Sequence, residues 1–551
     1  MRLIERRIGL LFAVFLFLLC AGAARAAWLS VVKRGTLERA AVTQQQADVV
    51  VPARRGAITD DHGVDLAVSE PAFDVAATPY LIKNPTAAAA KLAPLLHRPE
   101  DTLLRALARR DTGFAYLARR VPAQDADRAM KLKLEGLQFI PRYRRVYPRD
   151  WMASQLLGSV GTDGQGLSGL EYRLEKALRG QDGERRLVKD ALGQSIRMRD
   201  IRPERAGTNV HLTLDANLQD EAEQVLAEVG QTWQPKGATA IVMDPRSGAL
   251  LALANWPRVN ANDPYNAPQY AQEDRATEVT YEPGSTFKAF TVAAALEDHL
   301  VTPDTLFHLP PVLPVADRQI HDAEDHGYVS YTTRQILQVS SNIGAVMIGE
   351  RVGKAGLDSW IRKFGFGKPT GVDLPGEEAG ILLPLRRWSD STIGNVPIGQ
   401  GIAVTPIQMA AAYAAIANGG ILRAPHIVAA VGARRTRTPR GHRVISEATA
   451  ASIRSMLEGV LGPGGTASGA AIPGYVLAGK TGTAQKPIPG GYSKDKYVAS
   501  FVGFAPARDP KLLALIMVDE PKGQIYGGEV AAPAWRKITS FALNYLKIPP
   551  G

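Results

Sequence analysis

Cysteine is almost absent from the sequence: Cys20 is the single one among 551 residues, and it lies inside an apolar run near the N-terminus. An intrachain disulfide and a cysteine-based zinc site are therefore both excluded. If the protein works outside the cytoplasm, hydrophobic cores must stabilise it, which excludes a small disulfide scaffold but allows a large enzyme. No internal repeat of about 20 to 50 residues recurs either, which argues against a solenoid.

No basic arm stands out, although the balance of charges is mildly basic. Lysine and arginine number 65 against 54 aspartates and glutamates, a formal net charge of +11. Nucleic acid, anionic lipid and anionic cell-wall polymer would each suit this balance, so charge alone does not choose among them. Residues 434–440 are rich in arginine and are predicted to form a solvated loop, with contact to an anionic wall polymer as the alternative.

An apolar run over residues 8–24 follows a short basic N-terminal segment. About 17 to 20 apolar residues can cross a bilayer as a helix, and arginines before such a run favour a cytoplasmic N-terminus. A cleaved signal peptide is the alternative, because small residues flank Arg25, but the run is long for a signal peptide and Arg25 is unusual at a cleavage site. We therefore expect a single-pass cell-membrane protein with residues 1–7 in the cytoplasm, an anchor over 8–27 and an extracytoplasmic remainder.

The rest of the chain, for which length predicts about two to four domains, changes character near residue 207. Before that point, short apolar stretches alternate with turns and helical segments, and residues 185–206 are predicted to be an exposed, charged connection. After it, strands at both ends enclose a series of helices, which describes one α/β domain whose sheet is completed by its C-terminal strands. We therefore predict a first domain over residues 28–206 and a second over 207–551.

The elements of the second domain can be placed from apolar periodicity and from caps. Asp215 is expected to cap the first helix. Helices are expected at residues 217–229, 287–296, 334–352, 406–418, 447–460 and 532–546. Strands are expected at residues 211–214, 237–242, 249–254, 475–483, 498–504 and 512–518, of which the second and third should form a hairpin.

The tetrapeptide Ser-x-x-Lys occurs three times, beginning at Ser30, Ser285 and Ser493. Ser285 differs from the others because it follows Pro-Gly and opens an apolar helix, so that one helical turn places Lys288 on the same face. The N-terminal end of that helix favours negative charge near Ser285, and burial or a nearby cation would lower the pKa of Lys288 enough for it to accept a proton. The alternative is a helix cap at Ser285 with Lys288 on the surface.

Ser340-Ser341-Asn342 lies inside or beside the helix expected at residues 334–352. Ser340 and Asn342 are two positions apart, and a loop would present both side chains to one site. A hydroxyl can relay a proton there, and an amide can orient a substrate carbonyl. A cap at the start of a helix is the alternative.

Lys480-Thr481-Gly482-Thr483 ends a predicted strand. On a strand Thr481 and Thr483 face the same way, and Gly482 lets another backbone lie close alongside. Two hydroxyls and an ammonium beside an edge strand suit an extended peptide that ends in a carboxylate. The alternative is a polar β-turn.

Two further patterns are weaker. Residues 474–481 match the phosphate-binding pattern Gly-x4-Gly-Lys-Thr, but a strand lies between the glycines and no helix is expected after Thr481, so nucleotide binding is disfavoured. Residues 321–326 contain two histidines and three carboxylates without the helical spacing of a zinc enzyme. They are predicted to form a polar loop, and no metal site is expected.

Three ordered elements in one α/β domain, Ser-x-x-Lys, Ser-x-Asn and Lys-Thr-Gly, resemble those of the penicillin-binding proteins and serine β-lactamases. Residues 55–60, 145–148 and 169–171 are similar to pedestal motifs of the class B penicillin-binding proteins, so the resemblance runs from the anchor to the last helix. Asp61 stands where the family usually has arginine, and Asp150 where it often has glycine. Both departures put the salt bridges inside the pedestal in doubt.

The resemblance implies a fold and an activity. The fold would be an α/β transpeptidase domain with an antiparallel sheet sandwiched by helices, after an elongated α+β pedestal of the dimerisation type. The activity would be that of a peptidoglycan D,D-transpeptidase, which needs no cofactor, takes a stem peptide ending in D-Ala-D-Ala as its donor, and is trapped by β-lactams.

The resemblance also implies a role for each motif residue. Lys288 would take the proton of the nucleophile Ser285, and Ser340 would pass it to the departing D-Ala while Lys480 tunes the transfer. Asn342 would hold the substrate amide. The carboxylate would bind Thr481 and Thr483 beside Gly482, and the backbone amides of Ser285 and Thr483 would form the oxyanion hole.

Ser-Ser-Asn together with Lys-Thr-Gly-Thr is more similar to the division-type branch of the family than to the elongation branch. That likeness implies septal cell-wall synthesis, with a polytopic glycosyltransferase of the SEDS family and other division proteins as partners and no nucleic acid. The alternatives are an elongation-type transpeptidase, a D,D-carboxypeptidase or β-lactamase-type hydrolase, and a non-catalytic penicillin sensor. The pedestal and anchor argue against a secreted β-lactamase, and the short segment before the anchor argues against a sensor.

Overall fold

The computed structural model describes residues 2–32, 46–189 and 195–550. Lys33, in the first Ser-x-x-Lys match, and part of the predicted connection at residues 185–206 lie outside the described residues. The chain forms two compact units, each assembled from several segments. Unit 1 comprises Met1–Arg54, Ala72–Tyr143 and Gly180–Gly207, and unit 2 comprises Arg55–Pro71, Arg144–Arg179 and Thr208–Gly551.

Helix α1 (Arg2–Val31) contains the apolar N-terminal run. Its stretch Arg6–Val31 has a mean hydropathy of 2.2 over the most apolar window, and no second helix of the described residues is as long and as apolar. At about 1.5 Å per residue, such a helix is long enough to cross the roughly 30 Å hydrocarbon core of a bilayer. The apolar helix predicted at the N-terminus is therefore present, with the length and composition of a single-pass anchor.

Unit 1 contains a three-stranded antiparallel sheet in the order β1 (Gln46–Val51), β6 (Gly183–Lys189) and β7 (Ser195–Arg202). The prediction of a connection over residues 185–206 is therefore wrong. Arg186 Nε lies 2.7 Å from Asp48 Oδ1 and Arg185 Nε lies 2.5 Å from Asp200 Oδ1, so ion pairs join the strands. β6 reads Gly-Glu-Arg-Arg-Leu-Val-Lys, which lacks the apolar alternation by which strands are recognised.

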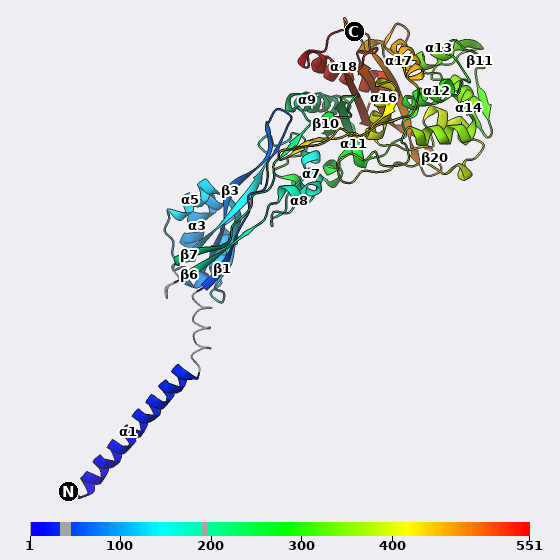
Figure 1. The fold of residues 1–551 in the computed structure, drawn as a ribbon. Coiled ribbons are helices and arrows are strands. Elements are labelled where there is room, and N and C mark those ends of the chain that lie inside the picture. The colour runs from blue at the N-terminus through cyan, green and yellow to red at the C-terminus, as the bar shows by residue number, and fades with distance from the viewer. Residues whose placement is uncertain (1, 33–45, 190–194, 551) are drawn as a thin grey trace. The chain divides into compact units, whose positions relative to one another are not determined.

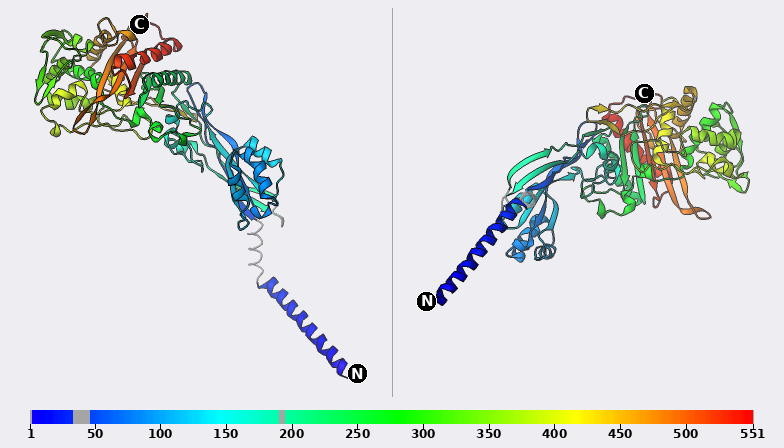
Figure 2. Two further views of the ribbon diagram at one scale, coloured as in Figure 1. Left: turned by 180° about the vertical axis from the view of Figure 1, so that it is seen from behind. Right: turned by 60° about the horizontal axis from the view of Figure 1, so that its bottom comes forward.

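The helices of unit 1 pack against its longer strands around a separate core that includes Leu92, Leu103 and Leu107. Figure 2 shows these helices, in blue, beside the strands of the unit. The elements are η1 (Pro79–Leu81), α3 (Pro85–Leu96), α4 (Glu100–Leu107), α5 (Ala123–Met130) and β4 (Ala115–Pro122), with parts of β3 (Asp65–Ala77) and β5 (Leu137–Val146).

Unit 2 is built on a five-stranded antiparallel sheet in the order β10–β9–β21–β20–β19. The strands are β9 (Gly237–Met243), β10 (Leu250–Trp256), β19 (Ala478–Ile488), β20 (Gly491–Ala505) and β21 (Leu512–Asp519). β9 and β10 form the predicted hairpin, and β9 pairs with β21, so the C-terminal strands complete the sheet begun by the first two. β19 is an end strand of this sheet.

Helices cover both faces of this sheet. Alternate side chains of a strand point to opposite faces, and every residue of β9 and β21 is buried, so neither face is left open to solvent. α9 (Ala216–Trp233) and α18 (Gly527–Tyr545) pack beside each other against the sheet, and α18, red in Figure 1, contacts β20. α11 (Arg275–Glu278) and α16 (Pro406–Ala417) contact each other and β9. The Asp215 side chain accepts the amides of Asn217 and Leu218, which confirms the predicted cap.

The motif-bearing helices depart from prediction at one place. A short η3 (Gly284–Phe287) precedes α12 (Lys288–Glu297), as expected for an apolar helix near residue 287. The single helix predicted over residues 334–352 is wrong: α13 (Thr333–Gln338) ends and α14 (Asn342–Lys363) begins on either side of Ser340. Ser340 has a left-handed φ of 62°, which a continuous α-helix does not allow.

Shorter elements complete unit 2. The strands are β2 (Ile58–Thr59), β8 (Val210–Leu212), β11 (Leu306–Leu309), β12 (Leu313–Val315), β13 (Arg318–Ile320), β14 (Val329–Thr332), β15 (Ile421–Leu422), β16 (Val428–Val431), β17 (Arg434–Arg435) and β18 (His442–Arg443). The helices are α6 (Ser154–Leu157), α7 (Gly169–Arg173), α8 (Glu175–Leu178), α10 (Gln269–Gln272), α15 (Thr392–Asn395), α17 (Glu447–Leu461), η2 (Pro264–Asn266), η4 (Leu385–Arg387), η5 (Val396–Ile398) and η6 (Ser468–Ala470).

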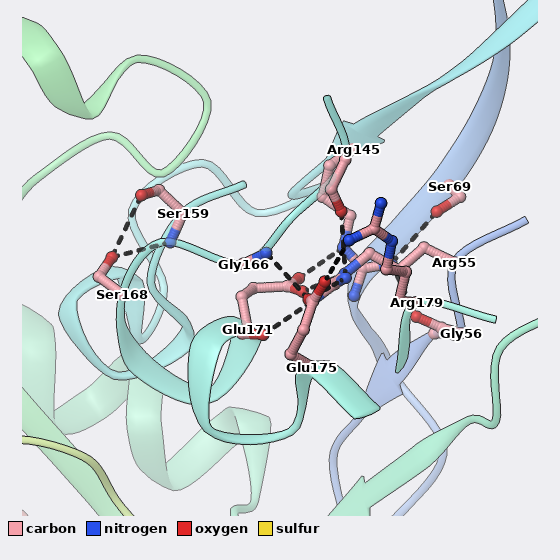
Figure 3. A network of polar contacts seen from close by, with 12 residues as sticks. Arg55, Gly56, Ser69, Arg145, Ser159, Gly166, Ser168, Glu171, Glu175 and Arg179 are labelled. Carbon is pink, nitrogen blue, oxygen red and sulfur yellow. Dashed lines mark hydrogen bonds and ion pairs between the residues drawn. The ribbon is translucent and has the colours of Figure 1, made fainter. Parts of the chain in front are cut away.

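A buried ion network lies in the N-terminal segments of unit 2 (Figure 3). Arg55 Nε is 2.6 Å from Glu171 Oε2, and Arg145 Nε is 2.5 Å from Glu171 Oε1, while Glu171 itself is fully buried. Arg55 Nη1 also lies 2.6 Å from Glu175 Oε2. The salt bridges that the sequence departures put in doubt are therefore present.

The two departures fit the structure without disturbing that network. Asp150 occupies a left-handed conformation with φ of 43°, which aspartate tolerates better than most residues. Its carboxylate accepts a hydrogen bond from Asn262 Nδ2 at 2.7 Å, and its carbonyl accepts one from the Ala261 amide. Asp61 is exposed and donates its backbone amide to Leu214 O.

Candidate active site

The fold brings the three sequence elements together. Ser285 lies in η3, Ser340 lies in the break between α13 and α14, and Lys480 lies on the end strand β19. η3 packs directly against β19, and Gly482 permits that approach. A β-carbon at Gly482 would lie 2.9 Å from Thr286 Cγ2 and 3.0 Å from Pro283 O, closer than side chains normally pack. Gly482 thus admits the close approach of the segment that contains Ser285, and also of Ser500 Oγ, which would lie closer still to the same β-carbon.

Lys288 is fully buried at the start of α12. Its Nζ donates to Ser340 O at 2.5 Å and to Asn342 Oδ1 at 2.7 Å, and it lies 3.3 Å from Ser340 Oγ. Burial lowers the pKa of Lys288 to about 7, although the negative charge of Asp322 opposes the shift. The alternative of a surface lysine is excluded, and a substantial fraction of Lys288 is neutral near neutral pH.

Lys480 is also fully buried, and it reaches Ser340 from the opposite element. Its Nζ donates to Ser340 Oγ at 2.9 Å and lies 3.2 Å from Thr481 O. Burial, reinforced by the nearby charge of Lys288, holds the pKa of Lys480 well below its ordinary value. The Ser340 hydroxyl therefore lies between two buried amines, a geometry through which a proton can pass.

Ser285 is partly exposed, unlike its buried neighbours in η3. Its side chain makes no capping hydrogen bond, so the alternative of a helix cap at Ser285 is not what the structure shows. Within the described part of the chain no side chain or backbone group hydrogen-bonds its hydroxyl, and Lys288 instead contacts Ser340 and Asn342. Ser285 thus presents an accessible hydroxyl one helical turn from a buried amine of lowered pKa.

Thr481 and Thr483 lie two positions apart on β19, with Gly482 between them. Thr481 Oγ1 is 2.7 Å from Thr466 Oγ1, and Thr483 Oγ1 accepts the amide of Gly527 at the start of α18 at 3.0 Å. Because β19 is an end strand, its outer backbone groups can pair with an extended ligand. The arrangement can hold a peptide as an added strand, with hydroxyls and an ammonium beside it.

Sequence reasoning missed partners of these residues. The loop at residues 321–326 was predicted to be merely polar, yet Asp322 accepts the Ser341 hydroxyl at 2.7 Å and the Asn342 amide at 2.5 Å. Thr466 and Gly527, which hold the two threonines of β19, were not anticipated either. Each of these contacts joins segments that are distant in the sequence, so no local sequence pattern predicts it. In the described residues no cluster of side chains suits a metal ion.

The competing patterns fail structurally. Lys480 and Thr481 lie within a strand that continues to Ile488, so the helix required after a phosphate-binding loop is missing there. Ser493 and Lys496 lie within strand β20, where Ser493 is buried and donates to Asp495 Oδ1 at 2.6 Å while Lys496 pairs with Glu520. The third Ser-x-x-Lys match therefore opens no helix. Ser30 is an exposed residue of α1.

Comparison with known families agrees with this geometry. Residues 238–540 match the penicillin binding protein transpeptidase domain, and residues 50–212 match the penicillin-binding protein dimerisation domain. The chain therefore belongs to the penicillin-binding protein transpeptidases. Its relatives are class B members of that family.

Individual relatives cover nearly the whole chain. The peptidoglycan D,D-transpeptidase FtsI of Escherichia coli is 33% identical over 99% of this chain and 93% of its own length. The stage V sporulation protein D of Bacillus subtilis is 34% identical over 98% of this chain and 85% of its own length. The crystal structure of penicillin binding protein 3 from Mycobacterium tuberculosis matches with a TM-score of 0.71 and 31% identity, covering 91% of this chain and 98% of that one.

Proposed function

We propose that this protein is a peptidoglycan D,D-transpeptidase that forms an acyl-enzyme on Ser285. One observation carries the proposal: the Ser340 hydroxyl lies 3.3 Å from Lys288 Nζ and 2.9 Å from Lys480 Nζ, where both amines are fully buried. Burying each amine costs desolvation free energy, and neither amine pairs with a carboxylate in the described chain. Two amines of lowered pKa around one hydroxyl therefore have no evident structural purpose. Beside an accessible serine, they form a proton path.

The first half-reaction would run through these groups. Neutral Lys288 takes the proton of Ser285, whose Oγ attacks the carbonyl of the penultimate D-Ala in a stem peptide ending in D-Ala-D-Ala. The backbone amides of Ser285 and Thr483 hold the developing oxyanion. The peptide C–N bond breaks, and Ser340 passes a proton to the departing D-Ala amine while Lys480 tunes that hydroxyl.

The second half-reaction would release the ester. The amine of a neighbouring stem peptide attacks the acyl carbonyl, the Ser285 oxygen leaves and regains its proton, and a new amide bond cross-links the peptides. The reaction involves only acyl and proton transfer, so the proposal includes no metal or cofactor.

Substrate binding would use β19 and the second motif. Thr481 and Thr483 would bind the terminal carboxylate, with Gly482 keeping the strand close to the nucleophile segment. Asn342 would hold the amide of the donor peptide. β-Lactams, which mimic the donor, would acylate the same serine.

We also propose a setting for the reaction. The similarity to E. coli FtsI supports septal cell-wall synthesis, with a polytopic glycosyltransferase of the SEDS family and other division proteins as partners. The arginines before the apolar helix support a cytoplasmic N-terminus and an extracytoplasmic catalytic part. Residues 28–206 would then act as the pedestal and residues 207–551 as the transpeptidase.

A labelling experiment on the detergent-solubilised full chain tests the nucleophile. A fluorescent penicillin should give one adduct, located by peptide mass on Ser285, and Ser285→Ala should abolish it. An adduct on another residue, or undiminished labelling of Ser285→Ala, would overturn the mechanism. Incubation with donor and acceptor stem peptides should then yield the cross-linked product, whereas hydrolysis alone would identify a carboxypeptidase.

A further inference from the structure

The loop between β13 and β14 carries Asp322, whose carboxylate binds the start of α14. Asp322 Oδ1 accepts the amides of Asn342 at 2.5 Å and Ile343 at 3.0 Å, and Oδ2 accepts the Ser341 hydroxyl at 2.7 Å. The Asp322 side chain is only 9% exposed. It therefore satisfies otherwise free amides of the first helical turn and fixes where that turn begins.

The same loop also sets the orientation of the side-chain amide of Asn342. Asn342 Nδ2 donates to His321 O at 2.8 Å, and Asn342 Oδ1 accepts from Lys288 Nζ at 2.7 Å. Rotating the amide by half a turn would put its NH₂ group against the amine of Lys288 and its oxygen against a carbonyl. The backbone of His321 thus keeps the oxygen of Asn342 facing Lys288.

His326 holds the Asp322 carboxylate from the other side. Its Nδ1 lies 2.6 Å from Gly327 O, and its Nε2 lies 2.9 Å from Asp322 Oδ2. A carbonyl and a carboxylate can only accept, so both ring nitrogens are best satisfied when both carry protons. The Gly327 carbonyl, and then Asp322, raise the pKa of His326 accordingly. The geometry is that of an ion pair between Asp322 and His326.

The charged groups around Lys288 are therefore few and can be named. Lys480 faces it from β19, and Asp322 faces it from the loop, while its direct contacts Ser340 and Asn342 are neutral. His326 is in turn faced by Asp322 and by Asp325 of the same loop. Negative charge at Asp322 favours the protonated form of Lys288, and positive charge at His326 offsets it.

We propose that Asp322 is a positioning residue of the acyl-transfer site: it holds the Ser341–Asn342 turn so that Asn342 faces Lys288, and His326 holds Asp322 in turn. The proposal rests on the proposed function, because it concerns the same site. Asp322 makes no hydrogen bond to Ser285 and acts only through Asn342 and Lys288. The loop at residues 321–326, predicted to be polar, would thus also position a residue of the site.

The test compares two substitutions of matched chemistry in one loop. Asp322→Asn keeps an acceptor for the two amides but removes the charge, and Asp325→Asn removes the same charge from an exposed side chain. The second-order rate of Ser285 acylation by a fluorescent penicillin is measured on the solubilised full chain across pH, together with the melting temperature. Because Asp322 favours protonated Lys288, Asp322→Asn should shift the rising limb of the rate to lower pH and lower the plateau about tenfold.

His326→Gln supplies a second, opposite signature. Glutamine can still donate to Asp322 but carries no charge, so Lys288 should bind its proton more tightly and the rising limb should move to higher pH. At pH values above the pKa of His326, the wild-type chain and His326→Gln should converge, because the wild-type imidazole is then neutral too. A purely structural role would not move the two variants in opposite directions.

The outcomes separate this proposal from the proposed function. Wild-type labelling that is absent, or that persists in Ser285→Ala, would count against the proposed function itself. If labelling depends on Ser285, three results would overturn the positioning role. The rising limb of the acylation rate against pH would be unshifted in both Asp322→Asn and His326→Gln, would shift in the same direction in both, or would shift equally in Asp325→Asn. If Asp322→Asn does not fold, His326→Gln, which leaves the carboxylate in place, decides the question alone.

Discussion

Lys480 Nζ donates to Ser340 Oγ at 2.9 Å, although the two residues lie 140 positions apart in the chain. Ser340 can receive this contact because it leaves the helical conformation, with a φ of 62° between two helices. Lys480 can make it because the end strand β19 packs against η3 and carries the lysine into the interior. A strained residue held at such a junction is typical of a site where local geometry serves chemistry.

The first prediction concerns Lys288. Lys288→Met fills nearly the same volume without an amine, so acylation of Ser285 by a fluorescent penicillin should fall about a hundredfold or more. Folding should be retained, because the buried amine is replaced by an apolar group of similar shape. Lys496→Met is the matched control: it occupies the third Ser-x-x-Lys match, is 53% exposed, and should leave the rate unchanged. Equal rates in the two variants would refute the assignment of Lys288 as the base.

The second prediction concerns pH. Burial lowers the pKa of Lys288 to about 7, so the amine is protonated and inactive as a base below that value and neutral above it. The acylation rate should therefore rise as pH increases through about 7 and then level off. Stopped-flow or time-resolved labelling between about pH 5.5 and 9 checks this expectation. A rate that is flat over that range would show that another group, or no titrating group, accepts the Ser285 proton.

Much of unit 2 could be predicted because its elements are locally determined. The cap at Asp215, the hairpin of β9 and β10 and the apolar helix after Ser285 each depend on residues within a few positions of one another. The helix break at Ser340 could not be predicted, because apolar periodicity continues on both sides of it. α13 ends in a left-handed residue, Ser340, after which the Ser341 amide donates back to Ile336 O. The start of α14 is set by a tertiary contact, because Asp322 from another loop accepts the backbone amides of Asn342 and Ile343.

The candidate site residues could be named from sequence motifs, but several of the residues that contact them could not. Short sequence patterns contain Ser285, Lys288 and Lys480, and the residue types and spacing of these patterns indicate their chemistry. The hydroxyl of Thr466 contacts that of Thr481, which lies 15 positions further along the chain. Nothing in the sequence around Thr466 distinguishes it from other loop threonines. In unit 1, ion pairs join β6 to β7 and to β1, and such contacts between strands leave no periodic signal in the sequence.

The third prediction concerns Thr466. Thr466→Val removes the hydroxyl 2.7 Å from Thr481 Oγ1 and keeps the shape of the side chain. The loss of one hydrogen bond contributes about 0.5–1.5 kcal/mol, which corresponds to roughly a two- to tenfold lower acylation efficiency if Thr481 is held by it. The effect should fall mainly on binding, since Thr466 does not contact Ser285 or Lys288. Ser468→Ala, an exposed neighbour in η6, is the control and should have no effect; a similar loss in both variants would mean that the loop as a whole, and not the hydroxyl, matters.

The last prediction concerns the stability of the buried ion network. Glu171 is fully buried between Arg55 and Arg145, at 2.6 Å and 2.5 Å. Glu171→Gln leaves two buried guanidinium groups with their charge less compensated, so the free energy of unfolding should fall by about 3 to 5 kcal/mol. Glu70→Gln is the matched control, because Glu70 pairs with Arg144 at 2.9 Å but is 47% exposed, and exposed pairs contribute about 0 to 1 kcal/mol. Chemical denaturation followed by tryptophan fluorescence measures both. Equal decreases in the free energy of unfolding in the two variants would show that the buried network stabilises the fold no more than an exposed ion pair does.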